Sequence, residues 1–168
     1  MFIPAPIFSD HMILSRRKEI RVFGTADEGS IITGTLDGKT ASAKTFGGRF
    51  HLLFPPMEAG VDYTLTLTDG ETSYTFIDVA IGDVFLAGGQ SNMELELQNA
   101  DEGQELIKTH DDPLLRSFYV PKVPNLTEDF LQNERQKSHW EICAPGQIKT
   151  ISAVAYFFAL KVRKEQNV

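Results

Sequence analysis

A series of short strand-like segments in the first 80 residues constrains the fold of this chain more than any other feature. These segments alternate β-branched or aromatic side chains with polar ones, and none shows a helical period. Asp37-Gly38 and Asp69-Gly70 separate two pairs of them, and Asp-Gly is a strong signal for a tight hairpin turn. Pro55-Pro56 cannot lie inside a sheet and ends another segment. We predict an antiparallel sandwich or barrel with strands at 19–23, 30–36, 40–45, 49–54, 63–68 and 72–79.

A different pattern begins near Val79 and predicts the start of an α/β unit. The apolar run from Val84 to Ala87 is typical of a buried strand. Ser152 is a good N-cap residue for the last helix, and 125–137 is polar enough to be a surface excursion. The expected elements are helices at 101–110 and 153–166 and strands at 114–120 and 138–143. We therefore predict a β-rich domain at 1–80 and an α/β domain at 81–168.

Length and charge limit the classes of partner. The chain has 168 residues, enough for one domain or two small ones, and a formal net charge of −7. No basic cluster offsets that charge, which argues against nucleic acid or an anionic membrane as a partner. The short run Arg16-Arg17-Lys18 is expected to be a solvated turn. No apolar run approaches the roughly 20 residues that span a bilayer. The amino terminus lacks a secretory signal pattern, so a cytoplasmic location is expected unless a leader was removed.

Cysteine and histidine usage gives no sign of a metal centre. Cys143 is the single cysteine, which excludes an intrachain disulfide and predicts a small buried apolar side chain. The four histidines include no pair with metal-ligand spacing. We predict no metal site and no cofactor.

The best candidate for chemistry follows the apolar run directly, at Gly88-Gly89-Gln90-Ser91-Asn92. Hydrolase nucleophiles are often presented on a tight turn at the carboxyl end of a strand. Ser91 would be the nucleophile, and its backbone N–H, the peptide donors beside Gly89 and the side-chain amides of Gln90 and Asn92 would stabilise an oxyanion. A serine also needs a base, usually a histidine held by a carboxylate. On spacing alone, an ordinary strand-to-helix turn explains the same residues equally well.

Six separated blocks add a resemblance to a known family. They are Ile7-Phe8-Ser9-Asp10-His11-Met12-Ile13-Leu14, Ile20-Arg21-Val22-Phe23-Gly24, Gly82-Asp83-Val84, Gly89-Gln90-Ser91-Asn92-Met93-Glu94, Trp140 with Cys143-Ala144-Pro145, and Ser152-Ala153-Val154-Ala155-Tyr156-Phe157-Phe158. Together they resemble the sialate O-acetylesterase family of the SGNH (GDSL-like) hydrolases. The resemblance implies a β-rich accessory domain followed by a three-layer α/β/α esterase domain with a parallel sheet. It implies a metal-independent serine mechanism that removes acetyl groups from O-acetylated sialic acids or related sugars, with Ser91 as nucleophile and backbone oxyanion donor.

The sequence also departs from this family. Members are several times longer and carry a later Gly-x-Asn block and an Asp-x-x-His segment that holds the base, and neither pattern occurs here. The residues three positions before the four histidines are Phe8, Gly48, Ile107 and Gln136, none of them aspartate. Ala159 stands where the family commonly has glycine. We expect a nucleophile without its base, and a structural or interdomain role for His11.

Three interpretations remain open. The chain is the amino-terminal part of an O-acetylesterase, or a non-catalytic carbohydrate-binding or interaction protein acting through its β domain, or a complete small esterase with an unconventional base. Under the first, only two or three parallel strands are available, and the incomplete sheet would expose an apolar face. We expect that face to be covered by a second copy of the chain or by a missing carboxyl-terminal part.

Overall fold

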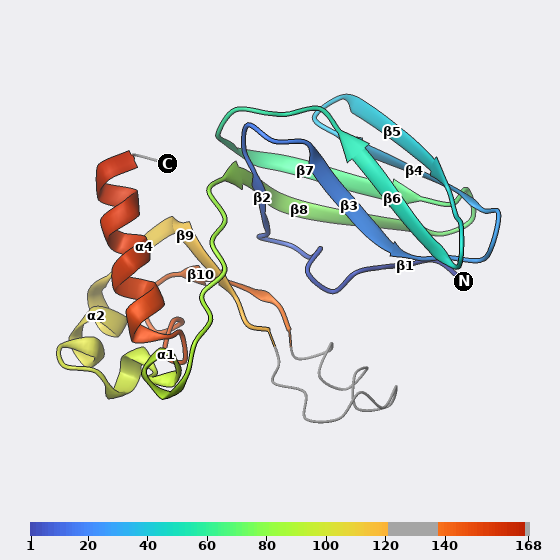
Figure 1. Ribbon diagram of the computed structural model, residues 1–168. Coiled ribbons are helices and arrows are strands. Elements are labelled where there is room, and N and C mark those ends of the chain that lie inside the picture. Colours follow the sequence, from blue (N-terminus) through green and yellow to red (C-terminus); the bar gives the residue numbers. More distant parts are fainter. Residues whose placement is uncertain (121–137, 167–168) are drawn as a thin grey trace.

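The structure is a computed structural model that describes residues 1–120 and 138–166. Residues up to Gly82 form two β-sheets packed face to face, and the remaining described residues form a smaller unit of short helices and one pair of strands (Figure 1). No helix among the described residues is both long enough and apolar enough to cross a membrane.

The sandwich consists of a five-stranded and a three-stranded sheet. The larger has the order β2-β8-β7-β4-β5, with β2 (Ile13–Ser15), β4 (Ile31–Leu36), β5 (Lys39–Lys44), β7 (Gly60–Thr68) and β8 (Ser73–Gly82). The smaller has the order β1-β3-β6, with β1 (Ile3–Pro4), β3 (Ile20–Thr25) and β6 (Arg49–Phe54). Neighbouring strands are antiparallel except for β2 and β8, which run parallel.

The structure confirms the predicted β-rich amino-terminal part. Each of the six predicted segments is a strand, with ends shifted by a few positions. Asp37 and Gly38 have φ angles of 49° and 72°, the left-handed conformation that a tight Asp-Gly hairpin requires. Strands β1 and β2 were not predicted from the sequence, because strands of two and three residues are too short to show alternation.

Alternation along the strands builds the sandwich core. In β6, Phe50, Leu52 and Phe54 are buried while the intervening residues are exposed, since successive side chains of a strand point to opposite faces. The core residues come from both sheets and include Ile20, Val22, Ile32, Leu36, Leu65, Leu67 and Val79.

The prediction of a buried strand from Val84 to Ala87 is wrong. Residues 83–89 continue from β8 without strand pairing, and Val84, Phe85 and Leu86 are exposed, Leu86 to 90%. A strand is stabilised by backbone hydrogen bonds to a neighbour and by burial of its faces. The described residues supply no neighbouring strand at this position, so the apolar run stays extended and open.

The second unit follows this segment. Its elements are α1 (Ser91–Glu94), η1 (Leu97–Asn99), α2 (Gly103–Thr109), β9 (Asp112–Phe118), β10 (Trp140–Cys143) and α4 (Ala153–Gln166). β9 and β10 pair antiparallel. The parallel sheet of a three-layer α/β/α domain is therefore not seen among the described residues, and the predicted surface excursion at 125–137 lies outside them.

The strand pair β9–β10 connects two hydrophobic cores. Its Leu115 and Cys143 belong to the core of the second unit, together with Ile107 of α2 and Tyr156 of α4. At its other end, Trp140 joins the sandwich core. β8 continues across position 80 to Gly82. The division into domains at 1–80 and 81–168 remains a prediction.

The predicted helix after Ser152 is confirmed. The Ser152 hydroxyl accepts a 3.4 Å hydrogen bond from the Ala155 N–H, as an N-cap does. Ala153 and Tyr156 face the core of the second unit. Ala159 and Leu160 are partly buried against the same core, whereas Val154, Phe157 and Phe158 are exposed.

Packing between the two sheets leaves no room for a side chain at Gly34 of β4. A Cβ atom added there would lie 2.7 Å from Leu52 Cδ1 and 2.9 Å from Phe54 Cζ. We expect Gly34→Ala to lower the free energy of unfolding by about 1–3 kcal/mol through overpacking, measured by urea denaturation. Thr35→Ala, the next residue and on the exposed face, is the control and should change it by less than about 1 kcal/mol. Equal stability of the two variants would contradict the close packing.

Candidate active site

Ser91 lies at the start of α1, on the turn that ends the extended segment. Gln90 precedes it with an extended backbone (φ −99°, ψ −154°), and its carbonyl accepts a 2.9 Å hydrogen bond from the Met93 N–H. A Cβ atom on Gly89 would lie 3.2 Å from Met93 Cβ. A side chain at Gly89 would therefore crowd Met93. Lack of space, and not a left-handed backbone conformation, favours glycine at this position.

The four predicted site residues, Gly89, Gln90, Ser91 and Asn92, share this turn and are all exposed. The Ser91 hydroxyl makes no hydrogen bond to another described residue, and α1 has no side-chain N-cap. Backbone N–H groups at the start of a helix lack partners within the helix. The turn thus presents a hydroxyl and open amide donors together, and their catalytic role remains a prediction.

Backbone contacts fix the turn against the start of α4. The Leu97 N–H donates to the Ile151 carbonyl at 2.8 Å, and the Ala153 N–H donates to the Leu95 carbonyl at 2.8 Å. The Ser152 hydroxyl lies 3.1 Å from Met93 Sδ. Two family-like blocks that are far apart in the sequence, 89–94 and 152–158, are therefore neighbours in the fold.

Two of the four histidines lie on the exposed surface beside other groups. The ring of His51 lies against Phe23, with centroids 6.2 Å apart, and His139 Nε2 is 3.6 Å from a carboxylate oxygen of Glu141. Neither contact involves Ser91.

His110, at the carboxyl end of α2, is partly exposed and contacts two fully buried side chains. Its Nδ1 lies 2.8 Å from the Tyr156 hydroxyl and 3.1 Å from Cys143 Sγ. Burial raises the pKa of Tyr156 to about 12 and also raises the pKa of the Cys143 thiol. Tyr156 therefore keeps its proton at neutral pH, and the tautomer of His110 sets which group donates in this hydrogen bond.

Cys143 is buried, as predicted from the sequence. Its raised pKa disfavours the thiolate, which is the reactive form, so this cluster stabilises the fold rather than supplying a nucleophile. No group of three or more histidine, cysteine, aspartate or glutamate side chains in the described parts of the chain is arranged to hold a metal ion.

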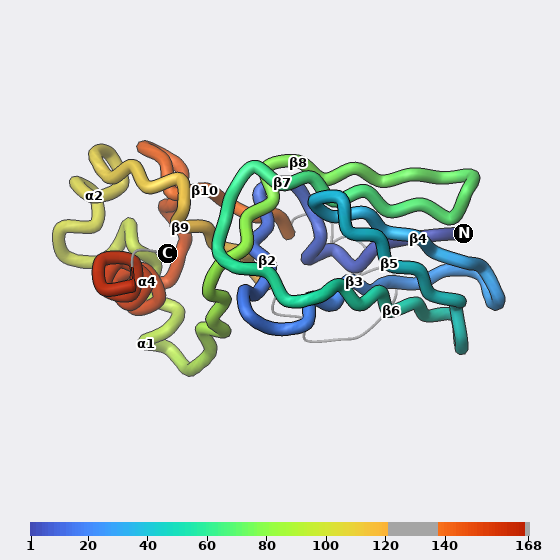
Figure 2. Tube along the Cα trace, turned by 90° about the horizontal axis from the view of Figure 1, so that it is seen from above, coloured from blue at the N-terminus to red at the C-terminus, as the bar shows by residue number. Residues whose placement is uncertain are grey.

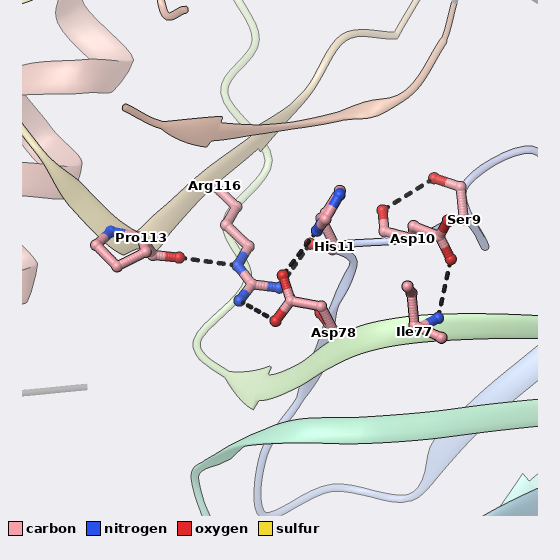
Figure 3. Close-up of polar contacts among 7 residues, drawn as sticks. All are labelled: Ser9, Asp10, His11, Ile77, Asp78, Pro113 and Arg116. Carbon is pink, nitrogen blue, oxygen red and sulfur yellow. Dashed lines mark hydrogen bonds and ion pairs between the residues drawn. The ribbon is translucent and has the colours of Figure 1, made fainter. Parts of the chain in front are cut away.

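A buried arginine joins the sandwich to the second unit (Figure 3). The side chain of Arg116 in β9 is 3% exposed. Its Nη1 donates to the carbonyls of His11 and Asp78, and its Nη2 donates to Asp78 Oδ1 at 2.9 Å. Its Nε donates to the Pro113 carbonyl at 3.0 Å. One guanidinium thus binds groups from three separate segments.

His11 and Asp78 are held in an uncommon backbone conformation at this joint. Their φ angles are 66° and 51°, in the left-handed region that costs most side chains free energy. His11 Nδ1 lies 2.7 Å from Asp78 Oδ2. These contacts agree with the structural, interdomain role expected for His11.

The same contacts set the ionisation of Asp78. Partial burial by itself would raise the pKa of this carboxyl, but the hydrogen bonds from His11 and Arg116 outweigh burial, and the pKa lies below its ordinary value. This cluster was not predicted from the sequence, where its only signal is a charged residue, Arg116, inside an apolar strand.

A second ion pair fixes the position of the chain where it leaves the sandwich after β8. Arg16 Nε and Nη2 donate to the two carboxylate oxygens of Asp83, each at 2.8 Å. The Arg16 side chain is 13% exposed. The predicted solvated turn is present for Arg17 and Lys18 but wrong for Arg16, because a carboxylate distant in sequence takes up its guanidinium.

The arrangement of the whole chain is similar to that of a solved enzyme. The crystal structure of a carbohydrate acetylesterase from Xanthomonas citri matches this chain with a TM-score of 0.86 and 30% sequence identity. The match covers 99% of this chain and 38% of that chain. No protein-family model and no curated protein matches the sequence. The chain therefore has the fold of part of a carbohydrate acetylesterase and spans 38% of that protein's length.

The joint at Arg116 can be tested by removing its guanidinium. Arg116→Met leaves the Asp78 carboxylate and three carbonyls without this donor, and we expect a loss of about 3 kcal/mol in the free energy of unfolding. Arg21→Met is the control. Its side chain is 70% exposed and 3.7 Å from Glu19, so its effect should stay within about 0.5 kcal/mol. Similar losses for the two variants in urea denaturation would contradict the role of the joint.

The lowered pKa of Asp78 predicts a loss of stability in acid. Folding favours the carboxylate form of Asp78. The stabilisation from its contacts is complete at pH values well above the ordinary pKa of 3.8, and it is lost as the pH falls through the lower pKa of the folded state. We expect Asp78→Asn to reduce stability at neutral pH and to flatten its decline below about pH 5, in urea denaturation at a series of pH values. Asp101→Asn, at an exposed position outside this cluster, should keep the wild-type slope. An unchanged slope in Asp78→Asn would refute the assignment.

Proposed function

We propose that this chain carries the nucleophile half of a carbohydrate O-acetylesterase site of the SGNH type, with Ser91 as the nucleophile. The supporting observation is the match of 99% of the chain to a carbohydrate acetylesterase at a TM-score of 0.86. The exposed Ser91 turn, held against α4, adds a group suited to acyl transfer. Sialic acids and related sugars that carry O-acetyl groups are the substrate class, in line with the family resemblance.

The chemistry divides into two acyl transfers. Ser91 Oγ attacks the acetyl carbonyl carbon while a base takes its proton, and the tetrahedral intermediate collapses to acetyl-serine as the sugar hydroxyl leaves with a proton. Water then attacks the acetyl-serine and releases acetate. The candidate donors to the oxyanion are the backbone N–H of Ser91, the Gly89 peptide and the side-chain amides of Gln90 and Asn92.

The described residues do not bring a base to Ser91. His11 and His110 are engaged with Asp78 and Tyr156, and His51 and His139 lie beside other groups. A serine without its base retains only the rate enhancement that comes from binding and oxyanion donors, about 10³–10⁴ over water in a well-studied protease. The chain by itself should therefore be a weak esterase. The alternative, sugar binding by the sandwich alone, would leave the Ser91 turn without a role.

This proposal is tested by acetate release from O-acetylated sialic acid and from p-nitrophenyl acetate, using the purified 168-residue chain. We expect slow release that Ser91→Ala lowers by at least about tenfold, because the nucleophile is lost. Ser73→Ala, at an exposed position in β8, is the control and should keep the wild-type rate. Equal rates for wild type and Ser91→Ala would refute the nucleophile. Rapid turnover by the wild-type chain would refute the proposal that this chain carries the nucleophile without its base.

A further inference from the structure

The hydroxyl of Ser152 makes two hydrogen bonds, and only one of them serves the helix that it caps. It accepts the Ala155 N–H at 3.4 Å, which is the capping bond of α4. It donates to Met93 Sδ, 3.1 Å away in α1. Figures 1 and 2 both show α1 beside α4. Asparagine or aspartate would cap a helix equally well, so capping does not explain the contact with Met93.

Met93 connects this contact to the Ser91 turn. Its N–H donates to the Gln90 carbonyl at 2.9 Å, and its Cβ lies 3.2 Å from the position that a Cβ atom on Gly89 would take. Residues 84–89 make no backbone hydrogen bond to another described residue, so packing against Met93 helps to fix Gly89. α1 is one turn of four residues without a side-chain cap, too short to be stable by itself. The position of Met93 therefore depends on contacts from outside α1.

The contact between Ser152 and Met93 lies closer to the proposed chemistry than the backbone pairing does. Among the described residues, backbone pairing with the start of α4 begins only at Leu95. The side-chain contact extends this joint toward Gly89 and Ser91. Oxyanion donors act because they are in place before the charge develops, and a misplacement of about 1 Å can cost about 10²-fold in rate. A contact that fixes the Gly89 peptide should therefore affect the rate of acyl transfer.

We propose that the Ser152–Met93 contact holds the Gly89 peptide and the Ser91 hydroxyl in the arrangement that acyl transfer requires, which makes Ser152 a positioning residue. The inference rests on the proposed function, because it concerns the same nucleophile. Ser152 acts through Met93 and the backbone at Gly89, without touching the substrate. The competing explanation is that Ser152 only caps α4, and substitutions at the two partners separate these explanations.

Three variants divide capping from the contact with sulfur. Ser152→Asp keeps an oxygen that caps the helix, but a carboxylate has no hydrogen to donate to Met93. Ser152→Thr keeps both the cap and the donor. Met93→Leu keeps an apolar side chain of similar volume and removes the sulfur acceptor. Because Met93→Leu leaves the cap untouched, it tests the contact independently of the stability of α4.

The test measures kcat and KM of the 168-residue chain with p-nitrophenyl acetate. We expect Ser152→Asp and Met93→Leu each to lower kcat by about tenfold with KM within about twofold of wild type, because positioning is lost while substrate binding is kept. Ser152→Thr should retain the wild-type kcat. Wild-type kcat in Ser152→Asp, or an equal loss of kcat in Ser152→Thr, would overturn the inference.

A double variant and a matched control sharpen this test. Ser152→Asp and Met93→Leu remove the two partners of one contact, so the combined variant should lose no more kcat than either single variant. A loss of about a hundredfold, the product of the single effects, would contradict a shared contact and overturn the inference. Met57→Leu is the control, since Met57 lies in the sandwich core, and it should keep the wild-type kcat. An equal loss in Met57→Leu would show a general response to methionine replacement and would also overturn the inference.

The NMR signal of the Met93 methyl group separates this inference from the proposed function. In a chain labelled at its methionine methyl groups, the signal that is absent from Met93→Leu belongs to Met93. We expect it to move in Ser152→Asp and to keep its place in Ser152→Thr. Equal rates of acetate release in wild type and Ser91→Ala, together with that pattern of signals, would refute the proposed function and leave the contact intact. Release that depends on Ser91 but not on Ser152 would overturn the inference and leave the proposed function intact.

Discussion

The arrangement of the two halves of this protein depends on one buried guanidinium. Arg116 binds the carbonyls of His11 and Asp78 and the carboxylate of Asp78, and so joins β9 to two segments of the sandwich. A buried charge is costly unless it is paired and fully hydrogen-bonded. β9 can therefore pack against the sandwich in few positions that still give the Arg116 guanidinium its partners. Trp140 of β10 adds a 2.8 Å hydrogen bond to the Ile7 carbonyl from the other strand of the pair. The strand pair is thus fixed to the sandwich by polar contacts at both of its strands.

The position of the Ser91 turn is set by contacts before and after it in the chain. The Arg16–Asp83 pair sets where the chain leaves the sandwich, and the contacts of Leu97 with Ile151 set where it meets α4. In the first part of this stretch, residues 84–89 make no backbone hydrogen bond to another described residue, and Val84, Phe85 and Leu86 are exposed. A turn held at both ends needs little rearrangement to bind a ligand or a partner, which reduces the entropic cost of binding. Fixed contacts at Asp83 and Leu97 are therefore compatible with an unpaired backbone at residues 84–89 between them.

Local patterns predicted much of the fold. The strand β6 and the Asp37-Gly38 hairpin were predictable because alternation and left-handed turn residues act over a few positions. The Ser91 turn was visible for the same reason, as two glycines and a serine after an apolar run. The clustering of Arg116 with His11 and Asp78 was not, since groups distant in sequence combine there without a local pattern.

The sequence by itself determined the β-rich sandwich, the helix that begins after Ser152 and the turn that carries Ser91, because short-range periodicity and capping act within a segment. Only the tertiary structure decided which charged side chains are buried, as Arg16 and Arg116 are, since a charge is buried where distant partners meet it. It also decided the state of Val84–Ala87. That run has the composition of a buried strand, but strand formation needs a neighbour, and here the run remains exposed.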